Sequence, residues 1–174
     1  QGCAYGISLW LPLSGTGAAE VDPYVFRSNM AAFTNCLFDV RDAKLDWDLL
    51  RRLVGQWRQV RECYLGDFWP LTPHSVAGDV WIAWQFDLPV AGRGMVQAFR
   101  RDQSVYEVAR LALRGLDADA EYEVTDLDSG RISRYPGAAL LAPGLRVELA
   151  DRPAAALLTY RRLDGAAGAA ASSG

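Results

Sequence analysis

The stretch Tyr64–Arg101, YLGDFWPLTPHSVAGDVWIAWQFDLPVAGRGMVQAFRR, decides the fold. Two apolar runs within it, Val80–Leu88 and Gly94–Arg101, are rich in β-branched and aromatic residues and are bounded by turn residues, which predicts two β-strands. Helical patterns precede Gly66 and are scarce after it. The chain therefore changes near this point from an α/β to an all-β organisation.

Five further short runs follow on the C-terminal side. They are Val108–Leu113, Glu121–Asp126, Arg131–Tyr135, Leu145–Leu149 and Ala155–Arg161. Residues 145–149 alternate between apolar and charged, which is typical of a strand with one buried and one wet face. Turn residues lie at 117–120 and 128–130, and Gly130 stands where a positive φ is needed. This pattern favours an antiparallel β-sandwich over residues 67–163, although strand number alone does not separate a sandwich from a barrel.

Upstream, strand and helix signals alternate. The apolar run Ile7–Leu11, closed by Pro12 and a turn at Gly15–Gly17, predicts a strand that is buried on both faces. A short helix is expected to begin at Asp22-Pro23 and to run through Met30, and Cys36–Val40 predicts a second buried strand. This order is that of a parallel α/β unit, and two such units cannot close a sheet by themselves.

A longer amphipathic helix is predicted from Asp46, its candidate N-cap, to a stop at Gly66. Apolar residues recur on one side of it at spacings of three and four, at Leu49, Leu50, Leu53, Val54, Trp57, Val60 and Tyr64. Such a stripe predicts one buried helix face.

Composition excludes several classes of protein. The 174 residues are 51% apolar, and 18 basic against 21 acidic residues give a net charge of −3 without long blocks of either sign, which disfavours a nucleic-acid or anionic-membrane partner. The three cysteines are widely spaced, so we expect buried thiols in a reducing compartment and neither disulfides nor a metal site. The sequence shows neither a membrane span nor a signal peptide, which predicts a soluble, cytoplasmic protein. The Ala/Gly/Ser-rich residues 164–174 predict a disordered tail.

Five pieces of the sequence together resemble one known family, the α-galactosidases of glycoside hydrolase family 36. In chain order they are YGISLWLPLSGTG, YVFRSNM, FDVRDAKLDWDLLRRLVGQWR, the opening stretch YLGDFWPLTPHSVAGDVWIAWQFDLPVAGRGMVQAFRR, and LALRGLDADAEYEVTDLDSG with its strand, turn and strand. The resemblance implies that residues 1–66 form the last strand–helix units of a (β/α)8 catalytic barrel and that residues 67–163 form the C-terminal β domain. It also implies retaining hydrolysis of a terminal α-galactoside or related oligosaccharide, without a metal or organic cofactor. A homo-oligomer is compatible with it.

The resemblance also implies what this chain does not contain. In the family, the nucleophilic Asp follows the fourth barrel strand and the acid/base Asp follows the sixth, in a segment that would end just before residue 1. Retaining glycosidases need both carboxyl groups, about 5 to 5.5 Å apart. We therefore expect no catalytic residue in this chain, and Gln1 with strand-like sequence soon after it suggests a chain entered in mid-domain. A processed natural start is the alternative.

Candidate substrate-binding residues follow from position, because the active face of a parallel barrel lies at the carboxyl ends of its strands. Trp10 would form an apolar platform under a sugar ring or, alternatively, a core contact. Arg27 would bind a sugar hydroxyl or orient a carboxylate; the alternative is an ion pair with Asp22 or Asp39. Asp39 and Arg41 point to the same side of one strand end, which favours a structural ion pair.

The remaining candidates have plainer interpretations. Tyr24 is a further substrate-binding candidate, although packing is its commoner role. His74, the single histidine, lies in a Pro-bounded segment without a nucleophile motif and is expected at a surface or interface. Trp84 and Phe86 share one strand face and Trp81 lies on the other, which favours packing over a sugar platform. An aromatic face exposed on one side would instead indicate a non-catalytic carbohydrate-binding module, and a purely structural β-sandwich cap is the third possibility.

Overall fold

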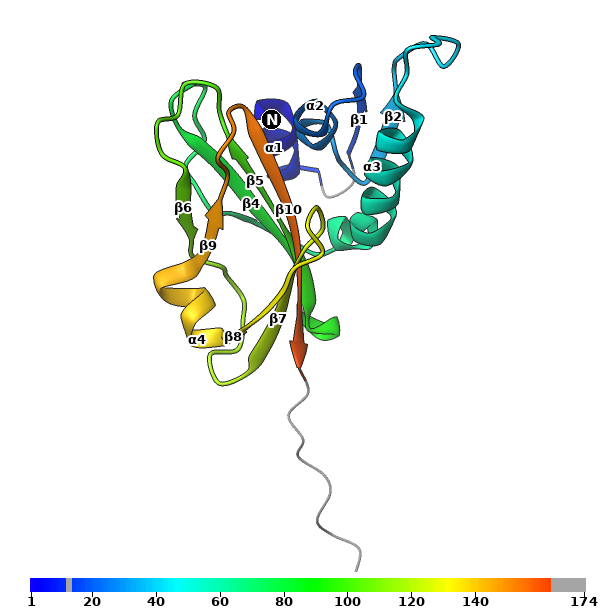
Figure 1. Cartoon of the computed structure of the whole chain (residues 1–174). Helices are drawn as coiled ribbons and strands as arrows, with labels where there is room; N and C mark the ends of the chain where they lie inside the picture. The colour runs from blue at the N-terminus through cyan, green and yellow to red at the C-terminus, as the bar shows by residue number, and fades with distance from the viewer. Residues whose placement is uncertain (12–13, 164–174) are drawn as a thin grey trace, which may run out of the picture.

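A six-stranded antiparallel sheet forms the centre of the molecule (Figure 1). The computed structural model describes residues 1–11 and 14–163. In spatial order the strands are β3 (Asp67–Pro70), β4 (Trp81–Leu88), β5 (Arg93–Arg100), β10 (Ala154–Leu163), β7 (Glu121–Asp126) and β8 (Ile132–Pro136). A second, two-stranded sheet pairs β6 (Val108–Leu111) with β9 (Leu145–Glu148). Short helical segments lie at η2 (Pro89–Ala91), α4 (Gly137–Ala139) and η3 (Leu140–Gly144).

The seven strands predicted after residue 80 are all present, with bounds shifted by a residue or two. Strand β3 is an addition to the strands predicted from the sequence. This strand is four residues long, pairs only with β4 and ends in Pro70, a residue that sheets tolerate at an edge strand. A short edge strand of this kind carries too little alternation to be recognised from sequence.

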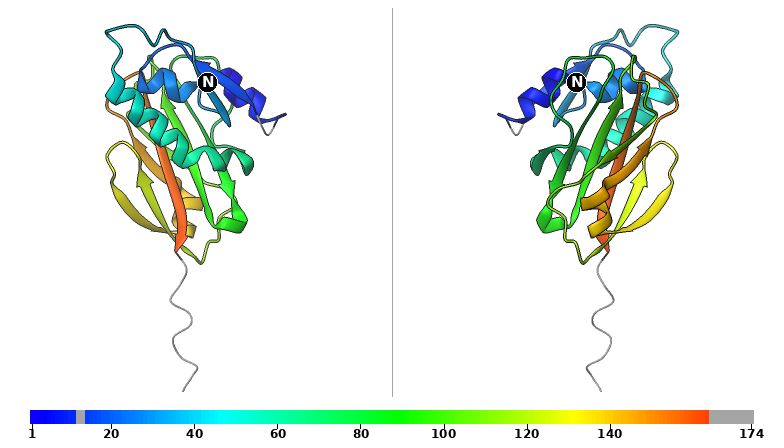
Figure 2. Two further views of the ribbon diagram at one scale, coloured as in Figure 1. Left: turned by 90° about the vertical axis from the view of Figure 1, so that its right-hand side faces the viewer. Right: turned by 90° about the vertical axis from the view of Figure 1, so that its left-hand side faces the viewer.

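Strand alternation divides the apolar residues between two cores. On one face Ile82, Trp84 and Phe86 of β4 pack under the helices, and on the other Ala83 and Val96 pack beneath the β6–β9 sheet. The helices and the small sheet lie on opposite sides of the large sheet in Figure 2. Trp81 belongs with the second core, so the predicted division of the aromatic residues between two faces is confirmed.

The first 40 residues differ from the prediction. Residues Gly2–Ser8 form helix α1, whereas a strand was predicted at Ile7–Leu11; Pro12 lies outside the described residues. The predicted turn at Gly15–Gly17 belongs to β1 (Gly15–Ala18), which pairs in parallel with β2 (Phe33–Cys36). The buried strand predicted at Cys36–Val40 is also wrong, because Leu37 and Val40 are exposed. A buried parallel strand needs neighbours on both sides, whereas a helix satisfies its own backbone hydrogen bonds. No described strand pairs with Gly2–Ser8 through backbone hydrogen bonds.

Both predicted helices are confirmed. Helix α2 (Pro23–Ser28) begins at Asp22, whose carboxylate accepts from the Val25 amide at 2.9 Å. Helix α3 (Trp47–Val60) begins at Asp46, and the 3₁₀ segment η1 (Arg61–Leu65) carries it on to Gly66. The predicted stripe supplies the buried side of α3, with Leu50, Leu53 and Val60 fully buried.

One core joins the two predicted domains. Residues of the N-terminal part such as Phe26 and Leu53 pack in the same cluster as Trp84, Phe99 and Leu157. No helix in the described part of the chain is long and apolar enough to cross a membrane. The predicted tail at residues 164–174 lies outside the described residues.

The cysteines also depart from the prediction. All three are free, but Cys3 and Cys36 are exposed and only Cys63 is buried. Cys36 was expected inside a buried strand, but β2, of which it is the last residue, is itself mostly exposed. Burial raises the pKa of the Cys63 thiol to about 11, so this thiol stays protonated at neutral pH.

Candidate functional site

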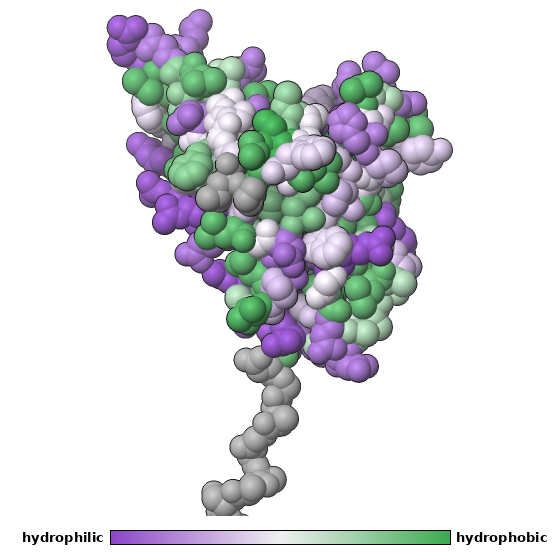
Figure 3. Space-filling view, turned by 180° about the vertical axis from the view of Figure 1, so that it is seen from behind, coloured by the Kyte–Doolittle hydropathy of each residue, from purple (hydrophilic) through white to green (hydrophobic). Residues whose placement is uncertain are grey.

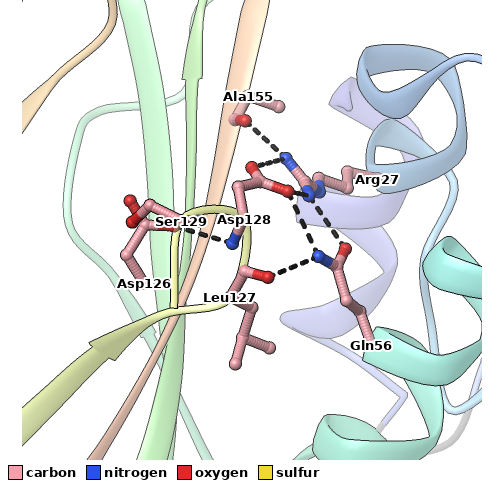
Figure 4. A network of polar contacts seen from close by, with 7 residues as sticks. All are labelled: Arg27, Gln56, Asp126, Leu127, Asp128, Ser129 and Ala155. Atoms are coloured by element: carbon pink, nitrogen blue, oxygen red, sulfur yellow. Dashed lines mark hydrogen bonds and ion pairs between the residues drawn. The ribbon is translucent and has the colours of Figure 1, made fainter. Parts of the chain in front are cut away.

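Arg27 lies at the centre of a network that joins α2, α3 and the sheet (Figure 4). Its side chain is 2% exposed. Nη1 donates to Asp128 Oδ2 at 2.7 Å and to the carbonyl of Ala155 at 2.6 Å, and Nη2 donates to Gln56 Oε1 at 2.8 Å and to Asp128 Oδ1. Both terminal nitrogens of the guanidinium thus donate to the same carboxylate. This bidentate geometry is the strong one for an arginine–carboxylate pair.

The partners of Arg27 are held by local structure. Asp128 lies in the turn between β7 and β8, where the Asp126 carboxylate accepts from the Asp128 amide at 2.8 Å and Gly130 takes the predicted positive φ of 69°. Gln56, on the buried side of α3, donates to the Leu127 carbonyl at 2.8 Å. The turn is therefore fixed both from within and from the helix above it.

The electrostatics of the network are those of a structural ion pair. Burial alone would raise the pKa of Asp128, but the hydrogen bonds from Arg27 and Gln56 and the positive charge of Arg27 outweigh it, and the pKa lies below its ordinary value. Among the described residues, Arg27 Nε has no partner, but it is buried. With both terminal nitrogens committed, Arg27 is closed to a sugar hydroxyl in this structure, and neither predicted partner, Asp22 or Asp39, contacts it.

Trp10 and Tyr24 lie in opposite surroundings. Trp10 is 85% exposed and belongs to neither core of the described residues. Tyr24 is half-buried and packs edge-on against Phe99, with ring centroids 5.9 Å apart. Tyr24 therefore occupies the packing position that was its commoner alternative.

Asp39 and Arg41 form the predicted ion pair on an exposed loop after β2. Arg41 donates from Nε and Nη2 to the two carboxylate oxygens of Asp39, both at 3.0 Å. These hydrogen bonds lower the pKa of Asp39 and raise that of Arg41. Apart from this pair, no hydrogen bond joins the five candidates within the described residues, so the structure does not assemble them into one pocket.

A second buried polar network was not predicted from the sequence. The Tyr160 hydroxyl donates to Asp87 Oδ1 at 2.6 Å, and Gln85 Nε2 donates to the Tyr160 oxygen at 2.7 Å. Burial raises the pKa of Asp87 despite the hydrogen bond from Tyr160, and burial also raises the pKa of Tyr160. The available signal was the polar pair Gln85 and Asp87 at alternate positions of an otherwise apolar strand.

The described residues contain no group of three or more His, Cys, Asp or Glu side chains that could hold a metal ion. His74 is exposed and lies edge-on to Tyr5, with ring centroids 5.4 Å apart. The structure thus shows a helix–sheet junction that is fixed by the hydrogen bonds of Arg27, with the exposed aromatic residue Trp10 near the N-terminal end of the chain.

The fold defines a class: it is shared with α-galactosidases of glycoside hydrolase family 36. One similar structure is the galactosidase domain of the α-galactosidase–sucrose kinase AgaSK, with a TM-score of 0.71, 21% identity, and coverage of 92% of this chain and 24% of that one. A variant of AgaA from Geobacillus stearothermophilus in complex with raffinose has a TM-score of 0.64 and 19% identity, over 80% of this chain and 19% of that one. An AgaA variant in complex with stachyose has a TM-score of 0.63 and 19% identity, over 81% and 19%.

The predicted resemblance is confirmed at the level of the fold. This chain spans about a fifth to a quarter of the length of the structures that it matches. The sequence matches no protein-family profile and no curated protein.

Proposed function

We propose that this chain is the C-terminal part of a retaining α-galactosidase resembling family 36. In this proposal residues 1–66 complete the wall of a (β/α)8 barrel and residues 67–163 form a β-sandwich that braces it. The substrate of the complete enzyme is a terminal α-galactoside of an oligosaccharide, and its catalytic carboxylates come from residues upstream of this sequence. The observation that carries the proposal is the fold match over 92% of this chain to 24% of a galactosidase domain.

The surface of the N-terminal part supports this proposal. Large exposed apolar residues are concentrated there, namely Ile7, Leu9, Trp10, Leu11, Phe33, Leu37, Val40 and Trp47. In Figure 3 apolar atoms reach the surface at the upper end of the molecule, where α1, β1 and β2 lie in Figure 1. Strands β1 and β2 pair only with each other within the described residues, so each has a free edge. Exposed apolar residues beside open strand edges are typical of a surface that pairs with further barrel strands.

The aromatic residues of the sheet do not favour a carbohydrate-binding module. Trp84 and Phe86 are buried, and Trp81 is half-buried with Nε1 bonded to the Tyr106 carbonyl at 2.8 Å. A sugar platform needs several aromatic faces exposed together. The three free cysteines accord with a cytoplasmic location, which we include in the proposal.

Incubation of the purified chain with p-nitrophenyl α-galactoside tests the proposal. We expect no release of p-nitrophenol above background, because Asp39 and its neighbour Asp42 come from one loop and cannot supply an acid and a nucleophile on opposite sides of one glycosidic bond. The positive arm is the longer polypeptide encoded upstream of Gln1, which should hydrolyse the same substrate.

The matched control is Asp39→Asn in the present chain. Turnover by the unextended chain that disappears in this variant would mean that an active site is built from the residues described above. Inactivity of the extended polypeptide on α-galactosides would equally contradict the proposal.

A further inference from the structure

A polar hollow of about 240 Å³ is lined by the end of α3, the segment η1 and the strands β5, β7 and β10. Its polar lining includes Gln59, Arg93, Glu123, Thr125, Thr159 and Arg161. The hollow is distinct from the Arg27 network, because it contains none of the residues of that network.

The floor of the hollow is built by strand register. Thr159 of β10 lies opposite Thr125 of β7, and Arg161 lies opposite Glu123 of β7 and Arg93 of β5. Adjacent strands thus present two hydroxyls in one row and, in the next, two neighbouring guanidinium groups (Arg93 and Arg161) followed by the Glu123 carboxylate. Backbone pairing fixes the spacing of these groups before any ligand arrives.

Ion pairs hold the charged side chains. Arg161 donates from Nε and Nη2 to Glu123 Oε1 at 3.0 and 2.8 Å, and Arg93 Nη2 donates to Glu62 Oε2 at 2.6 Å. Because each guanidinium faces a carboxylate, the set is close to neutral, and its side chains are oriented in advance. Preorganised groups of this kind lose less freedom on binding.

Hydrogen-bonding capacity remains unused in the hollow. The ion pairs of Glu123 with Arg161 use Oε1, and Oε2 lies 3.8 Å from Arg134 Nε, beyond hydrogen-bond range. Among the described residues, neither Thr125 nor Thr159 has a side-chain hydrogen bond, although both are half-buried. The hollow therefore offers free acceptors and donors side by side.

This combination selects a class of ligand. An anion would lie against the Glu123 carboxylate, a cation would lie against two guanidinium groups, and an apolar molecule would strip water from all of them. Hydroxyl groups both donate and accept, so a neutral polyol matches the mixture. The volume is below the range of about 300 to 1,000 Å³ typical of drug-sized ligands, which suits one small ring.

We propose that this hollow binds a single neutral sugar ring. Ring hydroxyls donate to Glu123 Oε2, accept from Arg93 and Arg161, and exchange hydrogen bonds with the two threonine hydroxyls. The groups that bind the ring lie on β5, β7 and β10, and the site needs no part of a catalytic centre. Its existence is therefore independent of the proposed hydrolase function.

Titration of D-galactose into the ¹⁵N-labelled chain tests this site directly. We expect saturable shifts of the Thr125, Thr159 and Arg161 amide signals, with a Kd in the millimolar range expected for so small a ligand. The double variant Thr125→Val/Thr159→Val keeps the side-chain shape and removes both hydroxyls, and it should weaken binding at least about tenfold. Glu123→Gln should also weaken it.

The matched control is Glu148→Gln, which disrupts a similar exposed ion pair with Arg146, 2.6 Å long, on the small sheet. It should leave the Kd unchanged, and thermal unfolding of every variant should show that the fold is kept. Absence of saturable shifts at about 100 mM galactose, or equal binding by the double valine variant and the parent, would overturn the proposal. Inorganic phosphate shifting the same amides at lower concentration would show an anion site instead and would overturn it equally.

Discussion

Arg27 is almost entirely removed from solvent, and its charge is balanced by a carboxylate 101 residues further along the chain. A buried guanidinium is tolerated only while it is paired and hydrogen-bonded. Removal of the Asp128 carboxylate would leave the Arg27 charge without its partner, so a substitution at Asp128 measures the contribution of this pair to stability. This partnership could not have been predicted from sequence, because no local pattern around either residue specifies the other. What the sequence did specify was the turn at Asp128–Gly130 that carries the carboxylate.

Asp128→Ala should lower the free energy of unfolding at pH 7 by about 2 kcal/mol, the range for a charged hydrogen bond, since water partly replaces a carboxylate that is 43% exposed. Urea unfolding measures this. Asp119→Ala, in an exposed turn, is the control and should change stability by less than about 0.5 kcal/mol. Equal effects of the two substitutions would show that the Arg27 pair contributes nothing specific.

The same pair gives a pH dependence with a definite sign. Because the folded pKa of Asp128 is below its unfolded value of about 3.9, its contribution is complete above that value and is lost as pH falls through the folded pKa. The stability difference between the parent and Asp128→Asn should thus stay constant from about pH 5 to 7 and shrink below about pH 4. A difference that grows on acidification would contradict this.

At the scale of elements, the local sequence was sufficient to predict those helices and strands that are specified by their own caps, turns and apolar patterns. Helix α3 was predictable because Asp46 caps it, the apolar stripe repeats, and Gly66 follows its end. Hairpin and alternating strands of the β domain were predictable for the same reason. Residues 7–11 were not, since a buried strand and a helix end share the same short apolar run, and only neighbouring strands decide between them.

Leu53, a buried residue of the α3 stripe, gives the test at this scale. Leu53→Ala should cost about 2 to 5 kcal/mol, because it opens a cavity between α3 and the sheet at a site that is 1% exposed. Leu49→Ala, half-buried on the same helix, serves as the matched control and should cost less. Chemical denaturation measures both, and a loss below about 1 kcal/mol at Leu53 would mean that the helix is loosely docked.

At the scale of the molecule, β10 joins the two cores. Leu157 belongs to the core beneath the helices and Leu158 to the core beneath the β6–β9 sheet. Leu157→Ala and Leu158→Ala should each lower one common thermal transition, recorded alike by tryptophan fluorescence and far-ultraviolet circular dichroism. Two separate transitions, with each variant moving only one of them, would show that the two cores unfold independently of each other.

The place of β10 also bears on how the protein is made. It is the last of the described strands in the chain, yet it lies between β5 and β7 in the middle of the sheet. Until the ribosome has synthesised β10, β5 and β7 have no strand between them to pair with. The apolar residues beneath the helices stay uncovered during that time. Loop closure over such long separations is slow. Folding of this region therefore waits until β10 has been synthesised, and the nascent chain depends until then on protection from aggregation.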